Sequence, residues 1–143
     1  MLNQAFFKPV YILTTRRDKV RQAVSLWRAQ QTGGWISDTQ WLSPFWTKNP
    51  VFDYERIQAL IQEIKADESA WNWFFKNYNI QPLRIVYEDF IADPKNTLFT
   101  IFSHIGITVP KNIVLPGPNM KKQSDELTEQ WVKKYYDRQK HAR

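Results

Sequence analysis

Residues 14–30 gather the side chains of this sequence that are best suited to hold an anion. Arg17 lies between a predicted strand and a predicted helix, where unpaired backbone N–H groups and the positive end of the helix dipole favour phosphate or sulfate. Arg21, Ser25 and Arg28 follow with helical i, i+4 and i+7 spacing, which places a hydroxyl between two guanidinium groups. This face suits a phosphomonoester, although a solvated helix face carries the same kind of pattern.

The composition agrees with an anionic partner and a packed core. The chain has 143 residues, a formal net charge of +6, 43% apolar residues and 15% aromatic residues, which predicts one globular domain. It contains no cysteine, which excludes disulfides and thiolate sites. The first residues do not match a secretory leader, and no run approaches the roughly 20 apolar residues of a membrane span. We therefore expect a cytoplasmic protein.

Apolar runs and helical periodicity predict the elements that position these side chains. They are, in order, a strand over 9–15, a helix capped by Asp18, a helix from Tyr54 that breaks or bends near Asp67, a strand over 83–90, a helix that begins at Pro94 with Asp93 as its cap and ends just before Gly106, and a last helix capped by Ser124. Both strands read as buried on both faces. The order β, α, α, β, α, α predicts an α/β fold with a parallel sheet. Two parallel strands make a poor sheet, so a sheet partner is expected to be missing.

A long irregular segment over residues 32–52 separates the first two predicted helices. Loops of this length inside a compact domain are often functional. Its aromatic residues include Trp35, Trp41 and Trp46, which could stack on the rings of a sugar. They could equally pack against the edge of the core, as large aromatic side chains usually do.

Few other residues have the types and spacing that chemistry needs. Glu88 and Asp89 lie at the end of the second predicted strand, where α/β proteins often bind ligands, and could supply a general base or a structural cap. His104 and His141 have no partner at metal-ligand spacing, so no metal site is predicted.

Three blocks of the sequence resemble the bacterial sulfotransferases of the trehalose and lipopolysaccharide, or nodulation, type. These enzymes use 3'-phosphoadenosine 5'-phosphosulfate (PAPS). The blocks are "TTRRDKVRQAVSLWRAQQTGGW", "VYEDFIADPKNTLFTIFSHIGI" and "KKQSDELTEQWVKKYYD". In this family an Arg at a strand end, followed eight residues later by a Ser on the next helix, binds the 3'-phosphate. Arg17 and Ser25 occupy those two positions.

The resemblance also implies roles for other residues. Arg21, Lys122 and Gln123 are expected near the cofactor, with a solvated hinge as the alternative for the last two. The three tryptophans of the long loop, Trp35, Trp41 and Trp46, are expected to border a carbohydrate acceptor such as trehalose or a glycolipid sugar.

The family further implies a parallel-sheet, P-loop-like sulfotransferase fold, of which residues 1–143 form a single partial domain. No Ser/Gly/Thr-rich loop follows the first strand, so the N-terminal strand, the phosphosulfate loop and the general base are expected to be missing. The catalytic residues are therefore unknown, and the isolated chain should have little activity. The alternatives are a non-catalytic nucleotide- or polyanion-binding remnant and a basic nucleic-acid-binding module. Binding to nucleic acid is disfavoured because the aromatic residues cluster in one loop. The chain could also form a homodimer.

Overall fold

The computed structural model describes residues 9–33, 49–109 and 126–141. The chain divides into two compact units. Residues 1–17 and 68–116 form one, here called the sheet unit, and residues 18–67 and 117–143 form the other, here called the helical unit. Helix α3 (Tyr54–Asn77) contributes its first part to the helical unit and its last part to the sheet unit.

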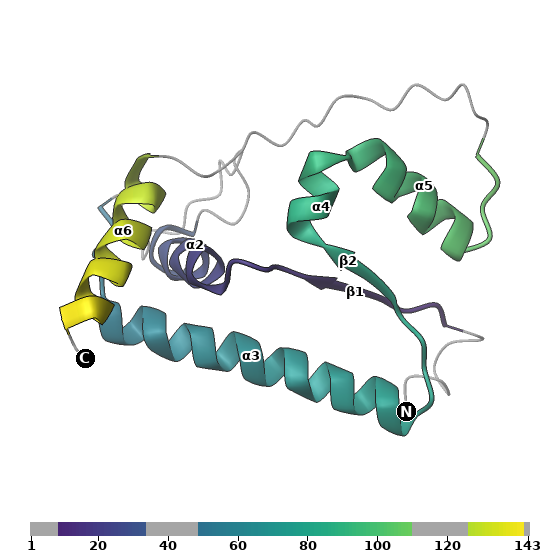
Figure 1. Ribbon diagram of the computed structural model, residues 1–143, viewed down its shortest axis with the longest axis horizontal. Coiled ribbons are helices and arrows are strands. Elements are labelled where there is room, and N and C mark those ends of the chain that lie inside the picture. The colour runs from purple at the N-terminus through teal and green to yellow at the C-terminus, as the bar shows by residue number, and fades with distance from the viewer. Residues whose placement is uncertain (1–8, 34–48, 110–125, 142–143) are drawn as a thin grey trace. The chain divides into compact units, whose positions relative to one another are not determined.

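The sheet unit contains the two described strands, which are parallel as predicted. Strand β1 (Ile12–Thr15) pairs with β2 (Leu83–Val86) so that Thr15 lies opposite Val86, and the two strands run side by side in Figure 1. Helix α4 (Tyr87–Ala92) follows β2 directly, and α5 (Pro94–His104) follows α4. An α/β architecture with a small parallel sheet is therefore confirmed.

Three details of the sheet unit differ from the prediction. The strand predicted to reach residue 90 ends at Val86, because the next four residues begin α4. The first strand begins at Ile12 rather than at residue 9. The strands are also not buried on both faces: Leu13 and Ile85 are buried, whereas Ile12 is 40% exposed. The described sheet has only two strands, so it offers only a small surface against which helices can pack.

Helix α5 has the ends that the sequence predicts. The Asp93 side chain accepts a hydrogen bond from the Asn96 backbone N–H, and Pro94 occupies the first turn, where its missing N–H costs nothing. Beyond the last turn, Gly106 adopts a left-handed conformation with φ of +77°. Local sequence alone therefore sets both ends of this helix.

The aromatic end of α3 lies against Tyr11, the residue that directly precedes β1 in the sheet unit. The Tyr11 ring lies 5.7 Å from the Phe75 ring in an edge-to-face arrangement, and the Trp71 ring stacks on Phe75 at the same centroid distance. Phe75 itself is buried, at 4% exposure. The predicted break near Asp67 is wrong, because α3 continues without interruption from Tyr54 to Asn77.

The helical unit has a core made by α2 (Lys19–Thr32), the first part of α3 and α6 (Glu126–His141). Helix α3 contributes one stripe at helical spacing, α2 contributes two small side chains, and α6 contributes a stripe with two aromatic residues. The buried residues of this core are Ala23, Val24, Tyr54, Ile57, Leu60, Ile61, Ile64, Trp131, Val132 and Tyr135. The helical periodicity from which α2 was predicted is confirmed by the burial of Ala23 and Val24.

Candidate anion-binding site

The candidate site lies where β1 and β2 end. Parallel strands present their carboxyl ends at the same edge of a sheet, so the residues that follow Thr15 meet those that follow Val86. Arg16 and Arg17 leave β1 at this edge, while Glu88 and Asp89 lie in the first turn of α4. The strand register therefore places two arginines opposite two carboxylates.

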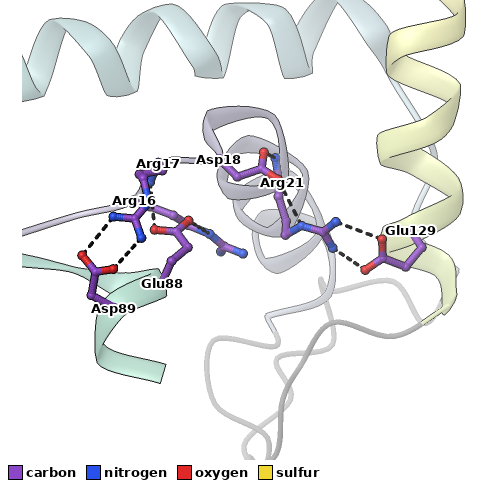
Figure 2. Close-up of polar contacts among 7 residues, drawn as sticks. All are labelled: Arg16, Arg17, Asp18, Arg21, Glu88, Asp89 and Glu129. Carbon is purple, nitrogen blue, oxygen red and sulfur yellow. Dashed lines mark hydrogen bonds and ion pairs between the residues drawn. The ribbon is translucent and has the colours of Figure 1, made fainter. Parts of the chain in front are cut away.

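Arg17 is held at two points by α4 (Figure 2). Its backbone N–H donates to Glu88 Oε2 at 3.0 Å. Its guanidinium donates from Nη1 to Asp89 Oδ2 at 2.9 Å and from Nη2 to Asp89 Oδ1 at 2.5 Å. One carboxylate thus fixes the main chain and the other fixes the side chain in a bidentate pair. The guanidinium remains accessible, because the Arg17 side chain is 59% exposed.

These contacts shift the ionisation of both partners. The hydrogen bond from Arg17 holds the pKa of Asp89 below its ordinary value, with the positive charge of Arg17 adding to the effect. The hydrogen bond to Asp89 likewise raises the pKa of Arg17. Both groups are therefore charged at neutral pH.

Arg16 is largely shielded from solvent and contacts two residues of α4. Its side chain is only 20% exposed, and its Nε lies 3.8 Å from Glu88 Oε1. Its guanidinium lies 4.6 Å from the centre of the Tyr87 ring, at the distance of a cation–π interaction. The first three residues of α4 thus engage both arginines.

Arg21 belongs to the helical unit, where it links α2 to α6. Asp18 caps α2 by accepting from the Arg21 backbone N–H at 2.8 Å, as predicted, and its second oxygen accepts from Arg21 Nε at 3.2 Å. The Arg21 guanidinium also donates to both carboxylate oxygens of Glu129 on α6 (Figure 2). Its pKa is raised, mainly by the hydrogen bond to Glu129.

Arg28 makes a second link between these helices, because its guanidinium donates to the hydroxyl of Thr128. The sequence predicts that the polar face of α2 that carries Arg21 and Arg28 suits an anion. In the structure, side chains of α6 bind both arginines. Ser25 lies between them in sequence and is half-buried on α2. The other predicted site residues, Lys122, Gln123, Trp35, Trp41 and Trp46, lie outside the described residues.

Sequence reasoning singled out Arg17, Glu88 and Asp89 but did not pair them, and it missed Glu129 as the partner of Arg21. The signal for the first pairing was present: two adjacent arginines follow one predicted strand and two adjacent acids follow the next. Parallel pairing brings such segments together at one edge. Nothing in the sequence marks Glu129 in the same way, because its contact depends on how α6 packs against α2.

Other kinds of site were considered within the described ranges. No cluster of three metal-ligating side chains occurs among these residues, and no helix there is long and apolar enough to cross a membrane. A pocket of about 640 Å³ lies at the amino-terminal end of β2, with Lys76, Arg84 and His104 in its lining. It is at the opposite end of β2 from Asp89, and ligands of α/β proteins bind at the carboxyl ends of strands.

The observed class is a mixed α/β protein with a small parallel sheet and an arginine pair at the carboxyl ends of its strands. Within this class, the chain belongs to the Stf0 sulphotransferase family, whose model matches residues 1–138.

Two curated relatives carry the name trehalose 2-sulfotransferase. The relative from Mycobacterium tuberculosis (strain ATCC 35801 / TMC 107 / Erdman) is 28% identical over 128 residues, which cover 90% of this chain and 46% of that protein. The relative from Mycolicibacterium smegmatis (strain ATCC 700084 / mc(2)155) is 28% identical over 127 residues, which cover 89% of this chain and 45% of that protein. The chain therefore spans about half the length of the curated relatives it matches.

Proposed function

We propose that this chain forms part of a PAPS-dependent carbohydrate sulfotransferase and binds the 3'-phosphate of the donor through Arg17. The observation that carries the proposal is the placement of Arg17 in a sulphotransferase-family chain. Its guanidinium lies at the carboxyl end of a parallel strand, oriented by Asp89 and still 59% exposed. Ser25 is assigned as the second 3'-phosphate ligand on the basis of its eight-residue spacing from Arg17.

The donor set at Arg17 fits a phosphate. Asp89 takes hydrogen bonds from Nη1 and Nη2, which form one edge of the guanidinium. Among the described residues, no hydrogen bond or ion pair involves Arg17 Nε, so the edge formed by Nε and Nη2 can make a second bidentate pair. A planar guanidinium can hold a carboxylate on one edge and a phosphate on another.

The remaining predicted residues complete this proposal. Arg21, Lys122 and Gln123 are assigned to the nucleotide site because the family resemblance implies it. Trp35, Trp41 and Trp46 border the acceptor sugar. PAPS would supply the sulfuryl group that is transferred to a carbohydrate hydroxyl. These residues would bind and orient the substrates, which is the main task of a protein in group transfer of this kind.

The acceptor that we propose is a carbohydrate such as trehalose or a glycolipid sugar, because both curated relatives are named as trehalose 2-sulfotransferases. We further propose that residues 1–143 belong to one partial sulfotransferase domain of P-loop-like fold, which is cytoplasmic and can form a homodimer. The family match spans both compact units, which supports a single domain. The 143 residues alone should be inactive, because no Ser/Gly/Thr-rich turn follows β1 to hold the phosphosulfate.

Calorimetry with 3',5'-adenosine bisphosphate tests the 3'-phosphate site. Loss of a charge-assisted contact should weaken binding about 10- to 100-fold in Arg17→Ala, with a smaller loss in Ser25→Ala. Binding of 5'-AMP, which lacks the 3'-phosphate, should not change in either variant. Arg56→Ala is the matched control, because Arg56 is an exposed-face arginine that pairs with Glu63 on α3.

Two results would contradict the proposal. Equal bisphosphate binding by Arg17→Ala and the unmodified chain would show that Arg17 does not hold the 3'-phosphate. Salt-sensitive DNA binding that is independent of both Arg17 and Ser25 would favour a nucleic-acid-binding module instead.

A further inference from the structure

We propose that Asp89 is a positioning residue, which sets the specificity of the Arg17 site for a nucleotide with a 3'-phosphate. This inference rests on the proposed function, because it assigns a role to a residue that supports the proposed ligand. Asp89 itself does not contact the nucleotide in this proposal. It acts by holding the Arg17 guanidinium in the orientation in which its free edge can receive the phosphate.

The contacts of α4 restrict Arg17 at both ends of its side chain. Glu88 Oε2 accepts a hydrogen bond from the Arg17 backbone N–H at 3.0 Å, which fixes the main chain. Asp89 accepts two parallel hydrogen bonds from the guanidinium. A bidentate pair defines both the position and the plane of a guanidinium, which a single hydrogen bond does not. A long arginine side chain is therefore ordered before any ligand binds.

The exposure of this pair indicates a role in recognition more than in stability. The side chains of Arg17 and Asp89 are 59% and 63% exposed, and ion pairs that solvent reaches to this extent contribute little to folding. What the pair does provide is preorganisation, because the entropy of fixing a flexible side chain is lost on folding and not on binding.

Asp89 could instead act as a competitor. Its carboxylate is an anion bound to the same guanidinium, and in that role donor binding would have to displace it. The geometry favours positioning, because Asp89 occupies only the Nη1–Nη2 edge and leaves Nε without a contact among the described residues. The pKa of Asp89 is lowered by Arg17, so the carboxylate keeps its charge under assay conditions near pH 7. The two roles predict opposite effects of neutralising Asp89.

The test compares binding of 3',5'-adenosine bisphosphate and of 5'-AMP by calorimetry in Asp89→Asn, Asp89→Glu and the unmodified 143-residue chain. Asp89→Asn keeps the size of the side chain but loses the charge and one acceptor. We expect it to weaken bisphosphate binding about 3- to 10-fold, from the cost of ordering one side chain, and to leave 5'-AMP binding unchanged. Asp89→Glu restores both acceptors and should recover part of the preference.

Glu63→Gln is the matched control, because Glu63 is an exposed acid that pairs with an arginine far from Arg17 in sequence. Circular dichroism confirms that each variant is folded. A merely structural effect would weaken both nucleotides together, so the ratio of the two affinities is the decisive readout. An unchanged or higher ratio in Asp89→Asn would overturn the inference, and a higher ratio would identify Asp89 as a competitor.

Arg17→Ala separates this inference from the proposed function. If Arg17→Ala loses the preference for bisphosphate and Asp89→Asn keeps it, the phosphate site stands and only the positioning role fails. If Arg17→Ala keeps the preference, both the site and the role of Asp89 are refuted.

Discussion

The ion pair between Arg21 and Glu129 should measurably hold α6 against α2, and a double-mutant cycle can determine its free energy. Arg21 is only 25% exposed and Glu129 is 53% exposed, so the pair is partly shielded from solvent, and its bidentate geometry places the coupling near the upper end of the range for surface pairs. We expect a coupling energy of about 0.5–1 kcal/mol. Glu129 also lies in the first turn of α6, where a negative charge adds about 0.3–1 kcal/mol through the helix dipole.

The cycle uses Glu129→Gln, Arg21→Met and the double variant. Glu129→Gln should lower the free energy of unfolding by about 0.8–2 kcal/mol, which is the sum of the ion pair and the dipole contributions. Arg21→Met keeps the apolar stem but also loses the contact with Asp18. The cycle removes this additional loss from the coupling energy, because the loss is common to both variants that carry the methionine.

Urea unfolding followed by tryptophan fluorescence measures these energies, since Trp131 on α6 is buried in the core of the helical unit. The coupling should shrink when the salt concentration is raised to about 0.5 M, because counterions screen accessible charges. Glu63→Gln provides the comparison for an ion pair that joins no two helices. A coupling energy near zero at low salt would refute the reasoning.

Two further predictions concern the core of the helical unit. Leu60→Ala should lower the free energy of unfolding, measured in urea, by about 2–5 kcal/mol, because Leu60 is 1% exposed and its loss leaves a cavity. The exposed control Gln62→Ala should change this free energy by less than about 0.5 kcal/mol. Equal losses in the two variants would show that Leu60 is not a core residue. Burial raises the pKa of Tyr135, so its contribution to stability is complete below the unfolded pKa of about 10 and is lost as the pH rises through the folded value. Urea midpoints should therefore fall less between pH 8 and pH 11 in Tyr135→Phe than in the unmodified chain, and equal falls would contradict the assignment.

Features that depend on neighbouring residues could be predicted from the sequence. Asp18 and Asp93 cap their helices as expected, because a cap needs only a short polar side chain three residues before the N–H that it binds. The apolar stripe of α3 could likewise be found from its spacing. These interactions lie within one or two helical turns, where periodicity and side-chain chemistry contain the necessary information.

The prediction failed where tertiary contacts decide the structure. The segment from Tyr87 to Asp89 is predicted as the end of the second strand, yet it begins a helix whose first turn engages Arg16 and Arg17. Asp67 interrupts the helical pattern in sequence, but an exposed acid is tolerated within a long helix. The side-chain partners of Arg17 and Arg21 could not be assigned, because they lie 72 and 108 residues away along the chain.

The same separation has a consequence for how the protein folds. Arg17 and Asp89 come together only when β1 has paired with β2, and that pairing closes a loop of roughly 70 residues at a large entropic cost. Contacts of such high sequence separation slow folding, whereas the helices need only local contacts to begin. In a chain whose helices have formed but whose strands are still unpaired, Arg17 would therefore lack its bidentate pair with Asp89. The pair between Arg17 and Asp89 is therefore present only in molecules in which β1 and β2 have already paired.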